Sequence, residues 1–381
     1  MFAFPRRVHL FAVASAILLA GCASLPNSGP TAHQILSGAA ASGPEDPIRL
    51  VDLNAATVAE ENALEATADA RHPTLGTLAI DGRADVVGPG DVLEIRLYEV
   101  GVTLFGGART SPEAFDPSAR GEAFSAVVVG RDGTIKLPFI NRLQVAGRAP
   151  SDIQSMVEAA YRGKSQAPQV LVGIRQNISQ TVFVSGDVRK PGRIELTLQR
   201  ERLLDVVATA GGATSRTQDM LVRFTRGDRS VTERLDRIVS GAPDDLVLIA
   251  GDRVQLIQQP QTYVVLGASN RVSQVSFDQS DVTLGEAIAR AGGPNDNTAD
   301  PRSVFLFRYA ARTDAAAPPE PTIYRIDLLS PVNYFLAQRF EMRHRDVLYV
   351  SNAPINRTAK AVGLINQLFS PFVAARTITG R

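Results

Sequence analysis

Apolar and polar residues follow the same order twice between about residues 181 and 352. The first copy starts with the β-rich run Thr181–Gly186, in which two valines flank Phe183. In Leu203–Gly212 the apolar residues recur at helical spacing until two glycines end the pattern. A further apolar strand, Ala250–Ile257, closes the copy. We therefore predict strand, turn, strand, short helix, strand, long connection and strand.

The second copy shows the same succession in Thr262–Gly267, Thr283–Gly293 and His344–Val350. Asp252 and Asp346 each precede the closing strand of a copy, where an aspartate is predicted to brace a turn. Self-similarity at such a period indicates a repeated module rather than a single enzyme core.

The pattern upstream of the repeats predicts a further domain of mixed structure. Val87–Glu99 joins a Gly-Pro-Gly-Asp turn to an apolar strand. The Asp-Gly turn at Arg131–Thr134 is expected to link a strand at Ala126–Val129 to its hairpin partner, Ile135–Phe139. The other elements predicted here are a long loop at 101–122, a helix capped by Ser151 and a strand at Val170–Ile174.

The N-terminus has the pattern of a bacterial lipoprotein signal. Arg6 and Arg7 precede the apolar stretch Val8–Ala20, which is too short for a comfortable transmembrane span. Small residues then lead to Cys22, the one cysteine of the chain. We predict cleavage after residue 21 and acylation of Cys22 with fatty acids such as palmitate; the alternative is an uncleaved anchor with an incidental cysteine. Ala23, which is not an aspartate, implies the outer membrane under the usual sorting rule.

The segment that follows is expected to be a tether and then a strand and a helix. Residues 23–47 are rich in Ser, Gly, Pro and Ala, so they are predicted to bury too little surface to fold. Ile48–Val51 has the composition of a strand, and Asn54–Ala70 that of a helix with Asn54 at its N-cap.

The tail after Asn352 predicts an amphipathic helix from Ile355 to Val373. About 19 residues give a length of about 28 Å, close to the hydrocarbon thickness of a bilayer. A ring of such helices could turn its polar faces to a water-filled lumen. A helix lying flat in the interface or packed on the soluble domain is also open, and Pro371 could end or kink the span. The polar, pore-lining face would carry Asn356, Lys360, Asn366, Gln367 and Ser370.

Composition narrows the function classes. The 381 residues have a net charge of +1, which gives no bulk attraction for nucleic acid. The sequence contains no Gly-x-Ser-x-Gly elbow, no Walker loop and no His/Cys spacing for zinc. We therefore expect no enzymatic activity, cofactor, metal or nucleic-acid partner.

Two weaker candidates remain open. The carboxylates of Asp91, Glu94 and Glu99 share one stretch, as a glycosidase pair could, although Asp91 reads better as a turn residue. Basic side chains in the first copy could contact an acidic glycan, although solvated loop charges are the simpler interpretation; these are Arg189, Lys190, Arg193, Arg200 and Arg202.

The two copies resemble the soluble-ligand-binding β-grasp (SLBB) module. Placed behind Val87–Glu99, they resemble the polysaccharide export outer-membrane lipoproteins, and Cys22–Pro30 is similar to the start of the capsule exporters within that family. The resemblance implies a multidomain α+β fold. Its segments are a signal peptide (1–21), a lipidated tether and N-terminal segment (22–80), an export domain (81–176), SLBB repeats (177–260 and 261–352) and a C-terminal amphipathic membrane-spanning helix (353–381).

The resemblance also implies a function. The chain would assemble into a ring, an octamer in the family, whose pore carries capsular or exopolysaccharide from the periplasm to the cell surface. An inner-membrane polysaccharide co-polymerase would be its partner, and most of the lipid-anchored chain would lie in the periplasm. The alternatives are a periplasm-facing lipoprotein that binds glycan or proteins without forming a pore, and a glycan-acting enzyme whose catalytic pair we do not find.

Overall fold

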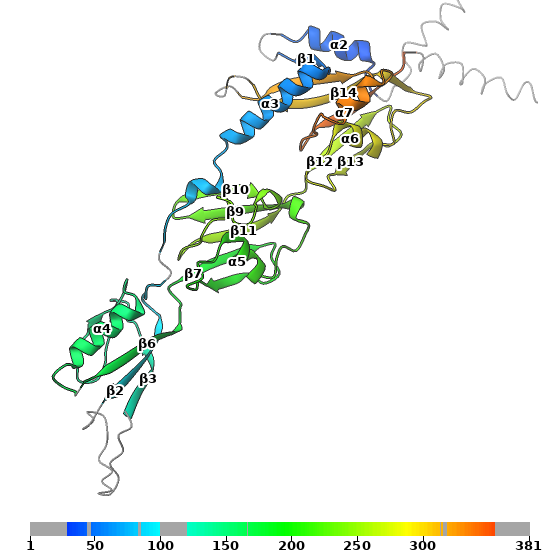
Figure 1. Ribbon diagram of the computed structural model, residues 1–381. Helices are drawn as coiled ribbons and strands as arrows, with labels where there is room; N and C mark the ends of the chain where they lie inside the picture. Colours follow the sequence, from blue (N-terminus) through cyan, green and yellow to red (C-terminus); the bar gives the residue numbers. More distant parts are fainter. Residues whose placement is uncertain are drawn as a thin grey trace, which may run out of the picture. The chain divides into compact units, whose positions relative to one another are not determined.

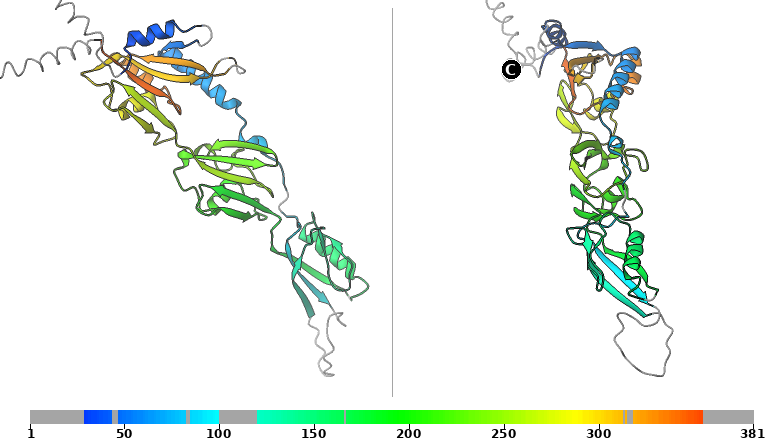
Figure 2. Two further views of the ribbon diagram at one scale, coloured as in Figure 1. Left: turned by 180° about the vertical axis from the view of Figure 1, so that it is seen from behind. Right: turned by 90° about the vertical axis from the view of Figure 1, so that its left-hand side faces the viewer.

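The computed structural model describes residues 29–43, 47–82, 85–99, 120–165, 167–312, 314 and 318–354. The chain divides into two compact units. One contains the chain up to His72 together with everything from Pro260 onward, and the other contains Pro73–Gln259. Figure 1 labels their elements, and Figure 2 shows them from two further sides. The polypeptide therefore passes from one unit to the other twice.

The first repeat is a five-stranded mixed sheet in the order β10-β9-β11-β7-β8. Its strands β7 and β11 are parallel, and the other neighbours are antiparallel. Leu203, Val206 and Val207 on the helix α5 are buried in its core. The elements are β7 (Thr181–Gly186), β8 (Gly192–Glu195), α5 (Leu203–Thr209), β9 (Met220–Arg226), β10 (Arg229–Arg234) and β11 (Arg253–Gln258), with short 3₁₀ turns η3 (Thr217–Asp219) and η4 (Leu235–Arg237).

The second repeat has the equivalent strand order, β15-β14-β16-β12-β13, which confirms the duplication. In both copies the predicted long connection contains a strand that we did not expect, β10 or β15. Only Val231 of β10 is buried, so its apolar alternation is too weak to read from sequence. The elements are β12 (Thr262–Gly267), β13 (Ser273–Ser276), α6 (Leu284–Arg290), β14 (Ala299–Ala310), β15 (Glu320–Ile326), α7 (Val332–Ala337) and β16 (Val347–Asn352).

The N-terminal segment completes the second repeat. Strand β1 (Arg49–Asp52) adds to the sheet edge parallel to β15, and helix α3 (Ala55–Arg71) follows it. The predicted strand and helix are thus confirmed. Asn54 caps the helix as expected, because its Oδ1 accepts N–H groups from Ala56 at 2.9 Å and Thr57 at 3.1 Å. Figures 1 and 2 show this blue segment beside the orange strands of the second repeat.

The prediction of an unfolded tether is wrong for residues 32–40. They form the helix α2 (Ala32–Ala40), and Ile35 and Ala39 are buried on it. Both pack in one cluster with Phe305, Ile323 and Tyr349, which lie on three neighbouring strands of the second repeat. A sequence poor in apolar residues can still fold where two of them, four positions apart, meet an apolar sheet face.

The export region forms a three-stranded antiparallel sheet with β2 (Val92–Glu99) between β3 (Arg120–Val128) and β6 (Gln169–Gln176). Helix α4 (Pro150–Tyr161) buries Ile153, Val157 and Tyr161 in the same core as β2. A two-stranded ladder of β4 (Thr134–Ile135) and β5 (Leu143–Gln144) lies between β3 and α4 in the chain. Upstream, the 3₁₀ turn η2 (Leu75–Leu78) packs into the core of the first repeat.

Three local predictions in this region are wrong. The Asp-Gly turn exists, but β4 pairs with β5 rather than with β3. Residues 120–122, expected in a loop, belong to β3. Ser151 does not cap α4: Pro150 is the first helical residue and Ala149 the N-cap, because proline is well suited to a position whose N–H has no helical partner.

Candidate functional site

The predicted site residues lie outside the described residues. Cys22 precedes Gly29, and the predicted helix, with Asn356, Lys360, Asn366, Gln367 and Ser370, follows Pro354. Within the part of the chain that the structure describes, no helix combines the length and hydropathy needed to cross a membrane. The structure shows the described residues that adjoin the two predicted membrane elements in sequence.

The two ends of the described chain meet on the second repeat. We call residues 29–31 and 349–354 the chain-end junction. The Tyr349 hydroxyl donates to the Pro30 carbonyl at 2.7 Å, and the Asn352 side-chain amide donates to the Gly29 carbonyl at 3.3 Å. Thr31 also forms a parallel bridge with Asn352. The entry and exit of the described chain are therefore side by side, although more than 300 positions separate them in sequence.

The chain-end junction is well fixed. Strand β16 lies between β14 and β12 in the sheet, and the Ala353 N–H donates to the Thr298 carbonyl at 2.9 Å. The Tyr349 ring packs edge-on against Phe307, with 6.3 Å between ring centroids. Burial raises the pKa of the Tyr349 hydroxyl, and its hydrogen bond with Asn352 partly opposes the rise. Gly29 has a φ angle of +138°, which favours glycine, and a Cβ there would also displace the Tyr349 hydroxyl.

Each repeat buries one bidentate arginine–aspartate pair. In the first, Arg226 donates to Asp252 through Nε at 2.9 Å and Nη2 at 2.6 Å. In the second, Arg308 donates to Asp346 at the same two distances. All four residues are less than 10% exposed. The pairs link β9 to the turn before β11 and β14 to the turn before β16, which gives them a structural role.

The same carboxylates brace turns, as predicted. Each accepts an N–H from the residue three positions before it, and Asp91 of the export region does the same. Asp91 also accepts the backbone N–H and the hydroxyl of Ser179, both at 2.7 Å, which joins the export region to the start of the first repeat. The turn donors are Gly88 (2.7 Å), Ile249 (2.8 Å) and Arg343 (2.7 Å).

Two of the three carboxylates considered for catalysis make structural contacts, and the third, Glu99, is buried at the end of β2. Asp91 is used in these hydrogen bonds, and Glu94 pairs with Arg96 at 2.6 Å. His344 Nδ1 accepts the Thr262 N–H at 3.1 Å. Among the described residues, no group of three or more His, Cys, Asp or Glu is arranged to hold a metal ion.

The basic residues of the first repeat also contact the protein itself. Arg189 donates to the Gly211 carbonyl at 2.8 Å, and Arg193 stacks over the Phe183 ring, 4.6 Å from its centroid. Arg200 pairs with Asp81 at 3.0 Å, while Lys190 is exposed. These contacts favour ordinary structural charges over a glycan site.

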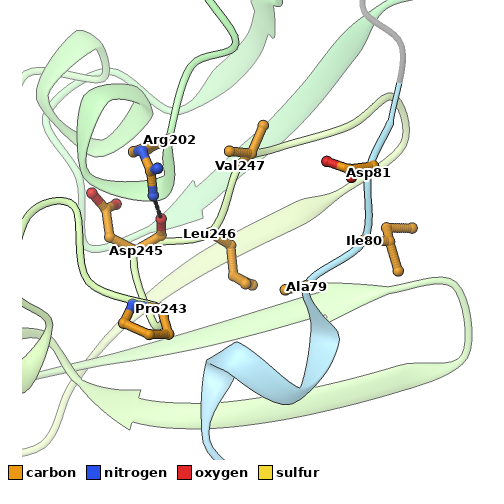
Figure 3. Close-up of a pocket in the computed structure, with 8 residues that line it drawn as sticks. All are labelled: Ala79, Ile80, Asp81, Arg202, Pro243, Asp245, Leu246 and Val247. Atoms are coloured by element: carbon orange, nitrogen blue, oxygen red, sulfur yellow. Dashed lines mark hydrogen bonds between the residues drawn. The ribbon is translucent and has the colours of Figure 1, made fainter.

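A cavity of about 320 Å³ lies where residues 79–81 cross the first repeat. In Figure 3, Ala79 and Asp81 lie on the side of Leu246 and Val247, whereas the Ile80 side chain points away from them. Arg202 donates to the Asp245 carbonyl at 2.7 Å. The Asp245 carboxylate accepts two backbone N–H groups, from Leu204 at 3.0 Å and Gly241 at 2.9 Å. The polar groups that line the cavity are used in hydrogen bonds within the first repeat. We therefore interpret the cavity as the place where residues 79–81 pack on this repeat.

Comparisons with known proteins place this architecture. Residues 80–175 match the model of the polysaccharide biosynthesis/export proteins, and residues 181–234 and 261–350 match SLBB domains. The capsule polysaccharide export protein BexD of Haemophilus influenzae is 34% identical over 393 residues, which cover 96% of this chain and 97% of BexD. The chain belongs to the polysaccharide export protein family.

Other polysaccharide export proteins agree. The capsule polysaccharide export outer membrane protein CtrA of Neisseria meningitidis serogroup B is 32% identical over 378 residues, covering 93% of this chain and 92% of CtrA. The EPS I polysaccharide export outer membrane protein EpsA of Ralstonia nicotianae is 29% identical over 299 residues, covering 77% of both chains. This member of the family is thus a mixed α/β protein with an export domain and two SLBB domains.

Proposed function

We propose that this chain is the subunit of an outer-membrane channel that passes capsular or exopolysaccharide from the periplasm to the cell surface. The names of its relatives, which describe capsule and exopolysaccharide export at the outer membrane, support the substrate class and the location. The observation that carries the proposal is the chain-end junction, because the described residues that precede and follow the two predicted membrane elements lie side by side there.

The geometry supports one common membrane attachment. Cys22 precedes Gly29 by 7 positions, so an extended chain would hold the acyl group within about 25 Å of the junction. The predicted helix begins at Ile355, directly after the last described residue at the junction. An acylated cysteine and a spanning helix that start this close together would enter the same leaflet. In this proposal the domain boundaries stay as predicted from sequence.

The pore itself would come from assembly. A ring closes when each subunit offers two different, complementary surfaces to its neighbours. In such a ring the tail helices would turn Asn356, Lys360, Asn366, Gln367 and Ser370 to the lumen and their apolar faces to lipid. We include the octameric ring and the inner-membrane polysaccharide co-polymerase in the proposal because the family resemblance implies them.

A tag after Arg381 tests the spanning helix. Antibody labelling of the tag on intact cells is expected, because the tail would end outside the outer membrane. The same tag placed in the exposed β9–β10 turn at Gly227–Asp228 is the control and should label only after permeabilisation. Labelling of both tags only after permeabilisation, in a chain that is intact and still exports polysaccharide, would contradict the span and favour a periplasmic binding protein.

A further inference from the structure

An apolar surface on the second repeat has no packing partner among the described residues. The segment Leu328–Gln338, which includes α7, contains no charged side chain. It exposes four large apolar side chains, which we call the α7 patch: Leu329 (55% exposed), Val332 (65%), Tyr334 (55%) and Phe335 (68%). Leu336 and Ala337 of the same helix are buried, so α7 is held in place from below. A group of exposed apolar side chains of this kind often indicates an interaction surface.

The strand register places the start of this segment at the chain-end junction. Ile326, at the end of β15, pairs with Val304, which in turn pairs with Val350 near the end of β16. Just beyond, the Leu328 N–H donates to the Pro301 carbonyl at 2.9 Å, and Ala353 is bound to Thr298. The α7 patch therefore begins at the end of the sheet from which both predicted membrane elements leave.

The first repeat serves as an internal comparison. Arg226 pairs across its sheet with Arg229 as Arg308 pairs with Thr322, so Leu329 corresponds to Asp236 and Val332 to Val239. Val239 and Val332 are both 65% exposed, but the segment that contains Val239 carries charged residues on both sides in sequence, namely Asp236, Arg237, Asp244 and Asp245. The uncharged aromatic surface is thus confined to the repeat that carries the chain ends.

We propose that the α7 patch lies in the interfacial layer of the periplasmic leaflet of the outer membrane. This inference rests on the proposed function, because it assumes that the chain enters the membrane at the chain-end junction. Aromatic side chains with one polar end, such as Tyr334, suit the boundary between headgroups and acyl chains. The free energy falls when lipid covers the apolar surface of Leu329, Val332 and Phe335. The predicted acyl group on Cys22 and the predicted tail helix would already hold this surface at the membrane. Contact between the α7 patch and lipid would therefore cost little further entropy.

Lipid is favoured over a second copy of the chain by the position of the patch. The segment that carries the patch starts at the same end of the sheet as the junction, so a tail that enters the membrane there would hold the patch near the bilayer. A contact between two copies of the chain would not require the patch to lie near the chain ends.

The test compares Val332→Cys with Val239→Cys in the full-length chain, reconstituted into phosphatidylcholine vesicles. An environment-sensitive fluorophore is attached to the new cysteine, and the parent chain, whose Cys22 is predicted to be acylated, measures background labelling. Vesicles that contain a lipid with a quencher near the headgroup should quench position 332 at least about twofold more than position 239, since interfacial elements lie about 5–10 Å into this layer. Both sites are equally exposed in the structure, so the difference reports the membrane.

Equal quenching at the two positions would overturn the inference. Protection of position 332 from water-soluble quenchers without quenching by lipid would also overturn it, because a protein surface would then cover the patch. The experiment is run on a chain that carries the tag after Arg381. Surface labelling of the tag with no lipid quenching at 332 rejects only the α7 contact, whereas loss of both signals rejects the proposed channel as well.

Discussion

At the scale of single residues, the buried arginine–aspartate pairs are the most demanding feature of the fold. Burial alone would lower the pKa of Arg308, but the hydrogen bonds and charge of Asp346 outweigh it and raise that pKa. The guanidinium also donates to the Glu341 carbonyl at 2.7 Å, so its charge is spread over several acceptors. A buried ion is tolerated only with such complete partnering, and removal of one partner is costly.

Asp346→Asn is therefore expected to destabilise the second repeat by about 3–5 kcal/mol, because Arg308 would stay buried without its counter-charge. Asp52→Asn is the matched control. Its bidentate pair with Arg325 has distances of 2.6 and 2.9 Å, but both side chains are at least one-third exposed. The control should cost less than about 1 kcal/mol. Urea unfolding followed by circular dichroism measures both, and equal losses would contradict the role of burial.

Buried tyrosines predict a loss of stability at alkaline pH. Burial raises the pKa values of Tyr161 and Tyr263 to about 12, with Glu99 adding to the rise at Tyr161 and Arg290 opposing it at Tyr263. A pKa raised by folding means that the native state holds the proton more tightly, so this stability is complete below about pH 10 and is lost towards pH 12.

Ultraviolet absorbance of the phenolate, followed with circular dichroism, should show these two groups ionising together with unfolding. Tyr263→Phe should weaken the alkaline dependence of stability, whereas Tyr309→Phe should leave it unchanged because Tyr309 is 76% exposed. An unaltered pH profile in Tyr263→Phe would contradict the prediction.

At the scale of elements, the two repeats end their first strands in the same way. Gly186 and Gly267 have φ angles of +81° and +84°, and a Cβ on either would overlap the carbonyl oxygen of the parallel neighbour, Leu256 or Val350. The parallel strands β7–β11 and β12–β16 can come this close only because glycine ends one strand of each pair.

Gly267→Ala should therefore destabilise the second repeat by more than about 1–2 kcal/mol, the cost of the left-handed backbone before the overlap is added. Gly38→Ala gives the opposite expectation. Gly38 is an exposed residue inside α2 with open space around its Cα, so alanine should stabilise the helix by about 0.5–1 kcal/mol. Thermal unfolding of both variants checks the sign, and a stabilised Gly267→Ala would refute the account.

Elements with strong local patterns could be predicted from the sequence. The alternation in Thr181–Gly186 and the glycine stop after α5 were sufficient, since both signals are local. The partner of β1 was not predictable, because a four-residue strand contains no information about a neighbour almost three hundred positions away. The cap of α4 was misplaced because Ser151 and Pro150 are competing start signals in adjacent positions.

The candidate site also has features that could be predicted from the sequence and features that could not. The turn role of Asp252 and Asp346 follows from the residue type and the apolar strand after it, and it is confirmed. Their arginine partners lie on another strand of the same repeat, 26 and 38 positions upstream, and the Tyr349–Pro30 contact spans 319 positions, so no local pattern predicts either. Cys22 and the polar tail residues lie outside the described residues and stay predictions.

At the scale of the whole molecule, the chain starts and finishes on one unit and builds the other in between. Lipidation of Cys22 is the prediction that belongs here. Cys22→Ser should abolish incorporation of radiolabelled palmitate, because a serine hydroxyl cannot form the thioether on which signal cleavage depends. Ser24→Ala, two positions away, should retain it. Palmitate in the Cys22→Ser chain, measured after immunoprecipitation, would show that acylation occurs elsewhere or that the signal has another role.

The position of β1 also has a consequence for biogenesis. Arg49 bonds to Thr322 and Asp52 to Arg325, each across 273 positions, so a segment made early waits for almost the whole chain before it finds its partner. Contacts of such long range form slowly. A product that stops short of β16 leaves Ile35 and Ala39 of α2 without Tyr349, and the N-terminal segment exposed to proteases. Complete docking of that segment therefore requires that synthesis has passed β16, whose Tyr349 packs against α2.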